Sequence, residues 1–126
     1  MIKVAILGAG IGREHLAALR ELNDDFKVLA VVDQNLERIE EIREGDDFSA
    51  YSVIDQALRD PEVDVIDICL PPHLHSKVTQ EALAAGKHVI CEKPLATSLA
   101  DIDLISRAAR RSKRLVFPVF QYRWGP

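Results

Sequence analysis

The stretch VAILGAGIG at residues 4–12 decides the fold class, because four apolar residues run directly into three closely spaced glycines. A short apolar run without strict alternation is typical of a strand that is covered on both faces. The glycines predict a tight turn, and apolar residues at helical spacing from Ile11 to Leu22 predict a helix behind it. The chain therefore opens with a strand–turn–helix unit.

The same alternation of elements continues along the chain. Apolar runs typical of strands occupy residues 2–7, 28–32, 63–70, 88–91 and 115–120, and a further short strand is expected around 48–51. Apolar residues at helical spacing cover 11–22, 36–44, 53–59, 75–85 and 99–111. Strands that alternate with helices predict an α/β fold, here a doubly wound, mostly parallel sheet of about six strands with helices on both faces.

Local signals agree with these boundaries. Ser52 and Ser98 are each followed three residues later by an aspartate, a pattern typical of helix N-termini. Gly45 and Gly86 stand where glycine would end the second and fourth helices.

Composition limits the classes of function. The chain has 126 residues, 48% of them hydrophobic, a net charge of -4 and a pI near 5.5. This acidic balance argues against nucleic-acid binding, since phosphate backbones repel it. No apolar run approaches the roughly 20 residues of a membrane span, and the start lacks the form of a signal peptide, so a cytoplasmic location is expected. Cys69 and Cys91 lie in interior strands as structural thiols, and no spacing predicts a metal site.

The glycine turn and Asp33 together predict a dinucleotide site. Gly8 and Gly10 leave backbone N–H groups open at a helix start, as a pyrophosphate requires, although such turns also merely connect elements. Asp33 ends the second strand, where a carboxylate binds the adenosine ribose and repels a 2'-phosphate, which favours NAD and leaves NADP as the alternative. Arg38 has the spacing of an ion pair with Glu41; the alternative is that it offsets that repulsion.

A second informative stretch is AGKHVICEKPL at residues 85–95, which places Glu92 and Lys93 at the carboxyl end of a buried strand. Ligands bind at this edge of a doubly wound sheet. An ammonium there can polarise a forming carbonyl and relay the proton that leaves an alcohol together with a hydride. The alternative is an ordinary solvated lysine. His15 is expected to be a packing histidine, and His75 either lines the site or is satisfied at a helix terminus.

The motifs resemble the glucose-fructose oxidoreductase and inositol dehydrogenase family, known as Gfo/Idh/MocA. The resemblance covers nearly the whole chain and rests on GAGIGREH at 8–15, PPHLH at 71–75, AGKHV at 85–89, EKPLA at 92–96 and RWGP at 123–126. The chain departs from the family pattern in a glycine turn one residue shorter and in Leu70-Pro71-Pro72, where the family more often has Thr-Pro-Asn.

The resemblance implies which residues form the site. Lys93 would be catalytic. Cofactor contacts are expected from Gly8, Ala9, Gly10, Ile11, Gly12, Asp33, Gln34, Leu70, Pro71, Pro72, His75, Glu92, Lys93, Arg123 and Trp124.

The resemblance also implies a domain organisation. Residues 1–120 would form an NAD(P)-binding Rossmann domain, and 121–126 would start the link to a C-terminal α+β domain that carries the substrate pocket. The expected function is hydride transfer between a nicotinamide cofactor and a sugar, polyol or related hydroxyl compound in a homo-oligomeric enzyme, with this chain alone inactive. The alternative is a non-catalytic dinucleotide-binding sensor or scaffold.

Overall fold

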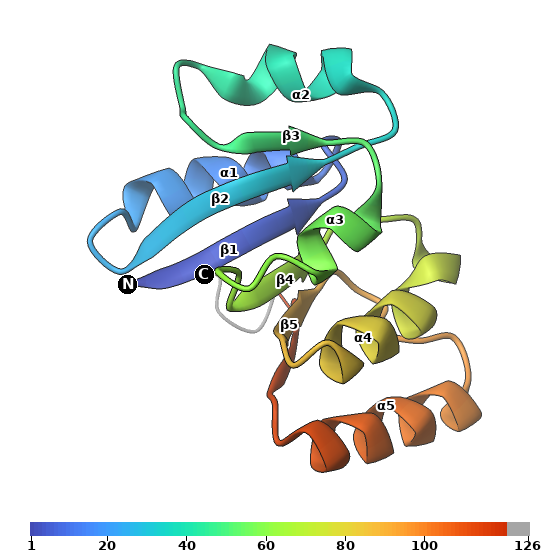
Figure 1. The fold of residues 1–126 in the computed structure, drawn as a ribbon. Helices are drawn as coiled ribbons and strands as arrows, with labels where there is room; N and C mark the ends of the chain where they lie inside the picture. Colours follow the sequence, from blue (N-terminus) through green and yellow to red (C-terminus); the bar gives the residue numbers. More distant parts are fainter. Residues whose placement is uncertain (121–126) are drawn as a thin grey trace.

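The computed structural model describes residues 1–120 as one six-stranded parallel sheet with helices on both faces (Figure 1). The strands are β1 (Ile2–Leu7), β2 (Phe26–Val32), β3 (Ser49–Tyr51), β4 (Val65–Ile68), β5 (His88–Cys91) and β6 (Val116–Pro118). The helices are α1 (Gly12–Glu21), α2 (Leu36–Arg43), α3 (Ile54–Leu58), α4 (His75–Ala84) and α5 (Leu99–Ser112), with a short 3-10 turn at Pro72–Leu74.

The strand order is β3-β2-β1-β4-β5-β6, and every neighbouring pair is parallel. The chain therefore builds outward from β1 in one direction through β2 and β3, and returns to add β4, β5 and β6 on the other side. The reversal between β1 and β4 is the switch point at which doubly wound sheets bind ligands, beyond the carboxyl ends of the strands. The predicted fold is confirmed.

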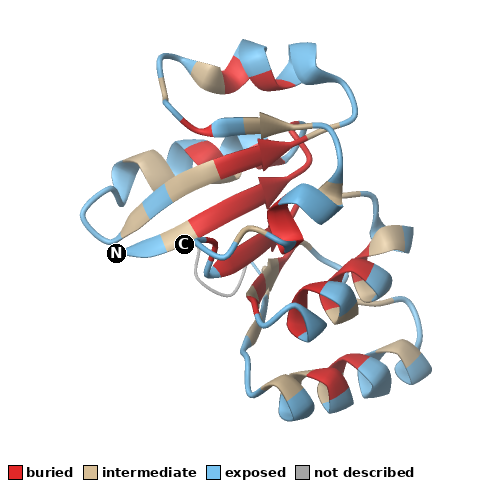
Figure 2. Ribbon diagram, viewed as in Figure 1, coloured by how far each residue is buried: buried red, intermediate tan, exposed pale blue. Residues whose placement is uncertain are grey.

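Two apolar layers sandwich the sheet because successive strand residues face opposite sides. In β1, Val4 and Ile6 join the layer beneath α1 and α2, while Ala5 and Leu7 join the layer beneath α3, α4 and α5. All four are fully buried. Figure 2 shows burial concentrated in the central strands and on the inner sides of the helices. A strand buried on both faces needs an apolar run rather than an alternating one, as the sequence has here.

Some boundaries differ from the expected ones. The fourth strand is shorter than 63–70, because Val63 N–H donates to Asp60 in a turn before the strand. Helix α3 begins after Val53 rather than Ser52, and the Gln56 side chain accepts from Val53 N–H at 3.3 Å. Ser98 caps α5 as predicted, its hydroxyl accepting from Asp101 N–H at 3.1 Å. Gly45 and Gly86 both have positive φ next to helix ends.

Candidate cofactor and proton-transfer site

Three glycines at the end of β1 have three different tasks. Gly8 has φ +98°, and a Cβ there would lie 2.5 Å from the carbonyl oxygen of Cys69, so no other residue fits this turn. Gly12 starts α1 against Ile6, whose Cγ2 would lie 2.8 Å from an added Cβ. Gly10 is exposed, and a Cβ there would lie 2.8 Å from a nitrogen of the half-exposed Arg38 side chain. The open face of Gly10 is the place where a phosphate can approach the first N–H groups of α1.

Asp33 follows β2 and is tied to the glycine turn. Its Oδ2 accepts a hydrogen bond from Ala9 N–H at 3.0 Å, and its Oδ1 accepts from Asn35 N–H at 2.9 Å. Arg38 Nη1 lies 3.7 Å from Asp33 Oδ2. The predicted ion pair of Arg38 with Glu41 is wrong among the described residues, because the guanidinium turns toward the glycine turn and the nearer carboxylate. Gln34 is exposed beside this group.

A cleft of about 740 Å³ opens at the carboxyl ends of β4 and β5. Its walls include Leu70, Pro72, His75, Glu92 and Lys93, five of the residues that the resemblance assigned to the cofactor. Ile11 lines this cleft and also a second hollow of about 440 Å³ between the glycine turn and Arg38. The two hollows therefore meet at the start of α1, with Arg38 at one end and Lys93 at the other. Pro71 is exposed in the same loop, and the Lys93–Pro94 peptide bond is cis.

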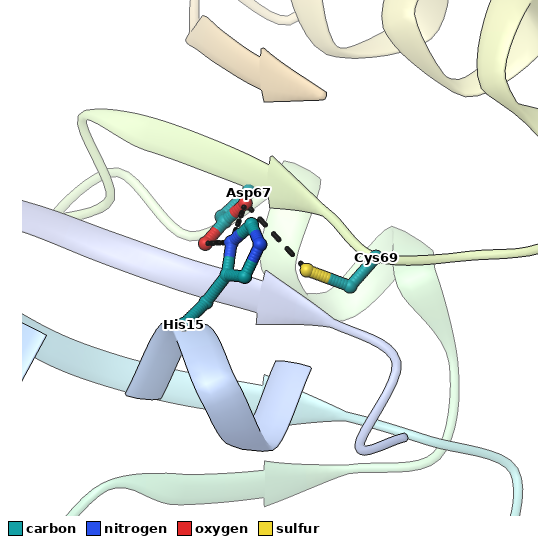
Figure 3. Close-up of side chains that lie close together, drawn as sticks. All are labelled: His15, Asp67 and Cys69. Carbon is teal, nitrogen blue, oxygen red and sulfur yellow. Dashed lines mark hydrogen bonds and ion pairs between the residues drawn. The ribbon is translucent and has the colours of Figure 1, made fainter. Parts of the chain in front are cut away.

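His15 links two carboxylates at the base of this cleft. Its Nδ1 lies 2.8 Å from Asp67 Oδ2, and its Nε2 lies 2.7 Å from Glu92 Oε1. Figure 3 shows the imidazole reaching from α1 to Asp67 on β4, with Cys69 beside it. The prediction that His15 is a packing histidine is wrong. Sequence spacing gave no sign of this link, because Asp67 and Glu92 are 52 and 77 residues away along the chain.

The charges at this link balance one another. Partial burial lowers the pKa of His15, but the hydrogen bond and charge of Asp67, followed by those of Glu92, outweigh burial and raise the pKa to about 9. At neutral pH the ring is therefore an imidazolium between two carboxylates. Asp67 is 1% exposed, and an unpaired charge at such a depth would be strongly destabilising. The charged partner that accompanies Asp67 in the central sheet is therefore His15.

Ligand-type atoms of His15, Asp67 and Cys69 lie within 4.8 Å of one another in the described residues, a grouping that the sequence spacing did not predict. The arrangement is explained without an ion. A proton of His15 occupies the short Nδ1–carboxylate contact, and burial, followed by the nearby carboxylates, raises the pKa of the Cys69 thiol so that it stays protonated. Burial likewise raises the pKa of Cys91 to about 12. Both cysteines are free and buried, in agreement with the structural role predicted for them.

His75 also bridges two elements. Its Nδ1 lies 2.7 Å from the carbonyl oxygen of Pro94, and its Nε2 lies 2.7 Å from that of Leu70. The residue is 1% exposed at the start of α4. His75 is thus satisfied at a helix terminus, and its side chain also borders the cleft; its contact with a cofactor stays a prediction. Arg123 and Trp124, the remaining predicted contacts, lie outside the described residues.

Comparison with known proteins identifies the family. The model of the oxidoreductase family with an NAD-binding Rossmann fold, Gfo/Idh/MocA, matches residues 2–120. This chain belongs to that family. The resemblance drawn from the glycine turn and the Glu92-Lys93-Pro94 segment is confirmed, and the family is an NAD-binding one.

Relatives of known type are much longer than this chain. It is 30% identical over 125 residues to a myo-inositol 2-dehydrogenase of Thermotoga maritima, covering 98% of this chain and 37% of the relative. It is 33% identical over 128 residues to an inositol 2-dehydrogenase of Rhodococcus jostii, covering 98% and 34%. The chain thus spans about a third of the length of these relatives.

Solved structures show the same likeness. The WlbA dehydrogenase of Chromobacterium violaceum, in complex with NADH and UDP-GlcNAcA, is 28% identical with a TM-score of 0.90, covering 97% of this chain and 36% of that one. A probable dehydrogenase of Thermotoga maritima is 30% identical with a TM-score of 0.90, covering 98% and 37%. No helix in residues 1–120 is both long and apolar enough to cross a membrane.

Proposed function

We propose that this chain is the cofactor domain of an NAD-dependent oxidoreductase that moves a hydride between the nicotinamide and a hydroxyl group of a sugar or polyol. The observation that carries the proposal is the pair of adjoining hollows, with the glycine turn and Arg38 at one end and Lys93 at the other. This arrangement fits an elongated ligand with a diphosphate in its middle. The inositol dehydrogenases among the relatives support the substrate class.

The residues of the turn fit the cofactor. Gly10 leaves the backbone open to a phosphate oxygen at the start of α1, and the nearby Gly8 turn admits no side chain. Asp33 already holds the turn through Ala9 N–H, and its carboxylate has lone pairs left for the ribose hydroxyls of the adenosine half. The nicotinamide, when bound, supplies the carbon that accepts or gives the hydride.

Lys93 supplies the proton chemistry in this proposal. It is exposed at the rim of the cleft, where a substrate hydroxyl has access. Oxidation of an alcohol releases a proton from oxygen as well as a hydride from carbon. An ammonium beside that oxygen stabilises the developing negative charge, and its neutral form takes up the proton.

Cofactor choice depends on Asp33 and Arg38 together. The Asp33 carboxylate repels a 2'-phosphate, which favours NAD. Arg38 is half exposed and only 3.7 Å from that carboxylate, so it is placed to pair with a phosphate as well. We therefore propose NAD as the main cofactor, with measurable binding of NADP.

The domain bounds, cellular location, oligomeric state and partners predicted from the sequence are also proposals. Residues 1–120 form the cofactor domain, 121–126 lead into a substrate domain, and the longer protein is a cytoplasmic homo-oligomer that binds no nucleic acid. The free thiols of Cys69 and Cys91 are compatible with a reducing compartment.

The test has two parts. NADH fluorescence titration of the 126-residue chain is expected to show saturable binding without polyol oxidation. In the longest natural form of the protein, Lys93→Ala is expected to lower kcat at least about a hundredfold, as loss of a general acid–base does, with NADH affinity changed less than about threefold. Absence of NADH binding would refute the cofactor site. Unchanged turnover in Lys93→Ala would refute the role of Lys93, whereas NADH binding without polyol turnover in the longest natural form would favour the sensor alternative.

A further inference from the structure

We propose that His15 and His75 hold the Glu92–Lys93–Pro94 turn from two sides, and that both are positioning residues for Lys93. The role of Lys93 itself rests on the proposed function. The hold on the turn is a property of this chain without cofactor, so it is testable separately.

The first set of contacts connects His15 on α1 to the turn through Glu92. His15 Nε2 lies 2.7 Å from Glu92 Oε1, and Glu92 Oε2 accepts from the backbone N–H of Lys93 at 3.3 Å. One carboxylate therefore connects the imidazolium to the backbone that carries Lys93. Asp67 fixes the other side of the ring, so the chain of contacts is anchored in the central sheet.

The second side runs from the start of α4 to Pro94. His75 joins the Pro94 carbonyl to the Leu70 carbonyl, each at 2.7 Å. Carbonyl oxygens only accept, so a neutral ring donates to one of them and a ring with two N–H groups donates to both. Leu70 and Lys93 both line the cleft, and His75 connects the two segments that carry them.

Few backbone hydrogen bonds hold the residues that follow the turn, although Leu95 packs against the apolar layer beneath α4 and α5. Glu92 N–H donates to Ile68, and the next backbone contact outside regular structure is Ile102 N–H to Ser98. Among the described residues, the bond between His75 and the Pro94 carbonyl is the one hydrogen bond that involves residues 94–97. Lys93 and Pro94 are both exposed. An exposed turn with so few backbone bonds depends on side chains for a fixed conformation.

The charged and titratable groups that line the cleft with His15 come from four elements. Asp67 and the Cys69 thiol lie on or after β4, Glu92 and Lys93 follow β5, His75 begins α4, and Glu14 is the neighbour on α1. With two carboxylates against one thiol that stays protonated, loss of the histidine proton leaves Asp67 and Glu92 without a cation between them. The turn should then loosen as the pH rises through about 9.

Hydrogen exchange of the cofactor-free chain, followed by mass spectrometry, tests the proposal. His15→Leu combined with Asp67→Leu removes the cation and its buried counter-ion together, so that no unpaired charge remains in the core. His15→Gln combined with Asp67→Leu differs only in keeping an N–H donor toward Glu92. His75→Leu tests the second side of the turn. His73→Leu is the matched control, because His73 is an exposed histidine in the same loop.

In peptides covering 92–97, the two hydrogen-bonded amides, Glu92 and Lys93, are expected to exchange about tenfold faster in His15→Leu/Asp67→Leu and in His75→Leu, because loss of a restraint worth about 1.4 kcal/mol is a tenfold change. The His15→Gln/Asp67→Leu variant should recover most of the protection, and His73→Leu should match the wild type. In the wild type, protection of 92–97, corrected for chemical exchange, should fall as the pH rises through about 9.

Two results would overturn the proposal. One is exchange of 92–97 within about twofold of wild type in both leucine variants, where a tenfold change is expected. The other is equal loosening of α2, which lies away from the turn, since that would mean general destabilisation. Neither result bears on NADH binding, and failure of NADH binding with a protected turn would refute the proposed function alone.

Discussion

Asp33 has two tasks in the structure, because the carboxylate that would bind the ribose also holds the glycine turn through Ala9 N–H. Asp33→Asn keeps the size of the side chain and removes its charge. We expect NADH to bind about tenfold more weakly, as loss of one charge-assisted hydrogen bond predicts, and NADPH to bind no more weakly than before. Fluorescence titrations with both cofactors measure the ratio.

Asp47→Asn is the control for net charge, because Asp47 is an exposed carboxylate after α2. Equal weakening of NADH and NADPH in Asp33→Asn would show that the carboxylate only supports the turn and does not select the cofactor.

His15 makes stability depend on pH. Its pKa is raised from 6.5 unfolded to about 9 folded, so its stabilisation is complete below pH 6.5 and is lost progressively as the pH rises to about 9. The shift corresponds to at most about 3 kcal/mol. Urea unfolding at pH 6.5, 8 and 9.5 should show this loss in the wild type and a smaller one in His15→Gln. A wild-type stability that stays constant over this interval would contradict the imidazolium assignment.

At the scale of the element, the serines that precede α5 and α3 allow a direct comparison of helix capping. Both Ser98 and Ser52 precede a helix and have an aspartate three residues later, yet only Ser98 caps. Ser98→Ala should lower the free energy of unfolding by about 1 kcal/mol, because the Asp101 N–H loses its acceptor. Ser52→Ala should change it by less than about 0.5 kcal/mol, the range of surface substitutions. Equal effects in chemical denaturation would mean that α3 begins one residue earlier than the structure has it.

At the scale of the whole molecule, a third hollow lies toward the amino ends of the strands and shares Ile90 with the cleft. About 770 Å³ in volume, it is bordered by Ile2 and Phe26 on one side and by Leu115 and Phe117 on the other. Leu115 and Phe117 are 57% and 56% exposed. The helices of the described chain cover β4 and β5 from the side of α4 and α5, which leaves these apolar groups accessible (Figure 1).

We expect this hollow to bind the apolar dye ANS. Replacing Leu115 and Phe117 together with serine should reduce ANS fluorescence severalfold, because exposed apolar area drives such binding. NADH affinity should stay within about twofold, because Leu115 and Phe117 line neither the cleft nor the hollow beside Arg38. A large loss of NADH binding in this variant would show that this hollow and the cleft are coupled.

The sequence alone determined the order of elements, the parallel doubly wound sheet and the family. Those features follow from local patterns: apolar runs of strand length, helical spacing between them, and glycines where a backbone turns sharply. It also predicted Asp33 and Lys93 as site residues, because they stand one and two residues after strands and the carboxyl ends of parallel strands share one edge.

Only the tertiary structure decided which side chains meet at that edge. His15, Asp67 and Glu92 come from α1, β4 and the end of β5, and no periodicity in one segment encodes their contact. Arg38 has two possible carboxylate partners, Glu41 on its own helix and Asp33 after β2. The packing of α2 beside the glycine turn brings its guanidinium to Asp33. Local pattern is set by each residue's neighbours in the chain, whereas charge pairing is set by distances that exist only after the sheet has closed.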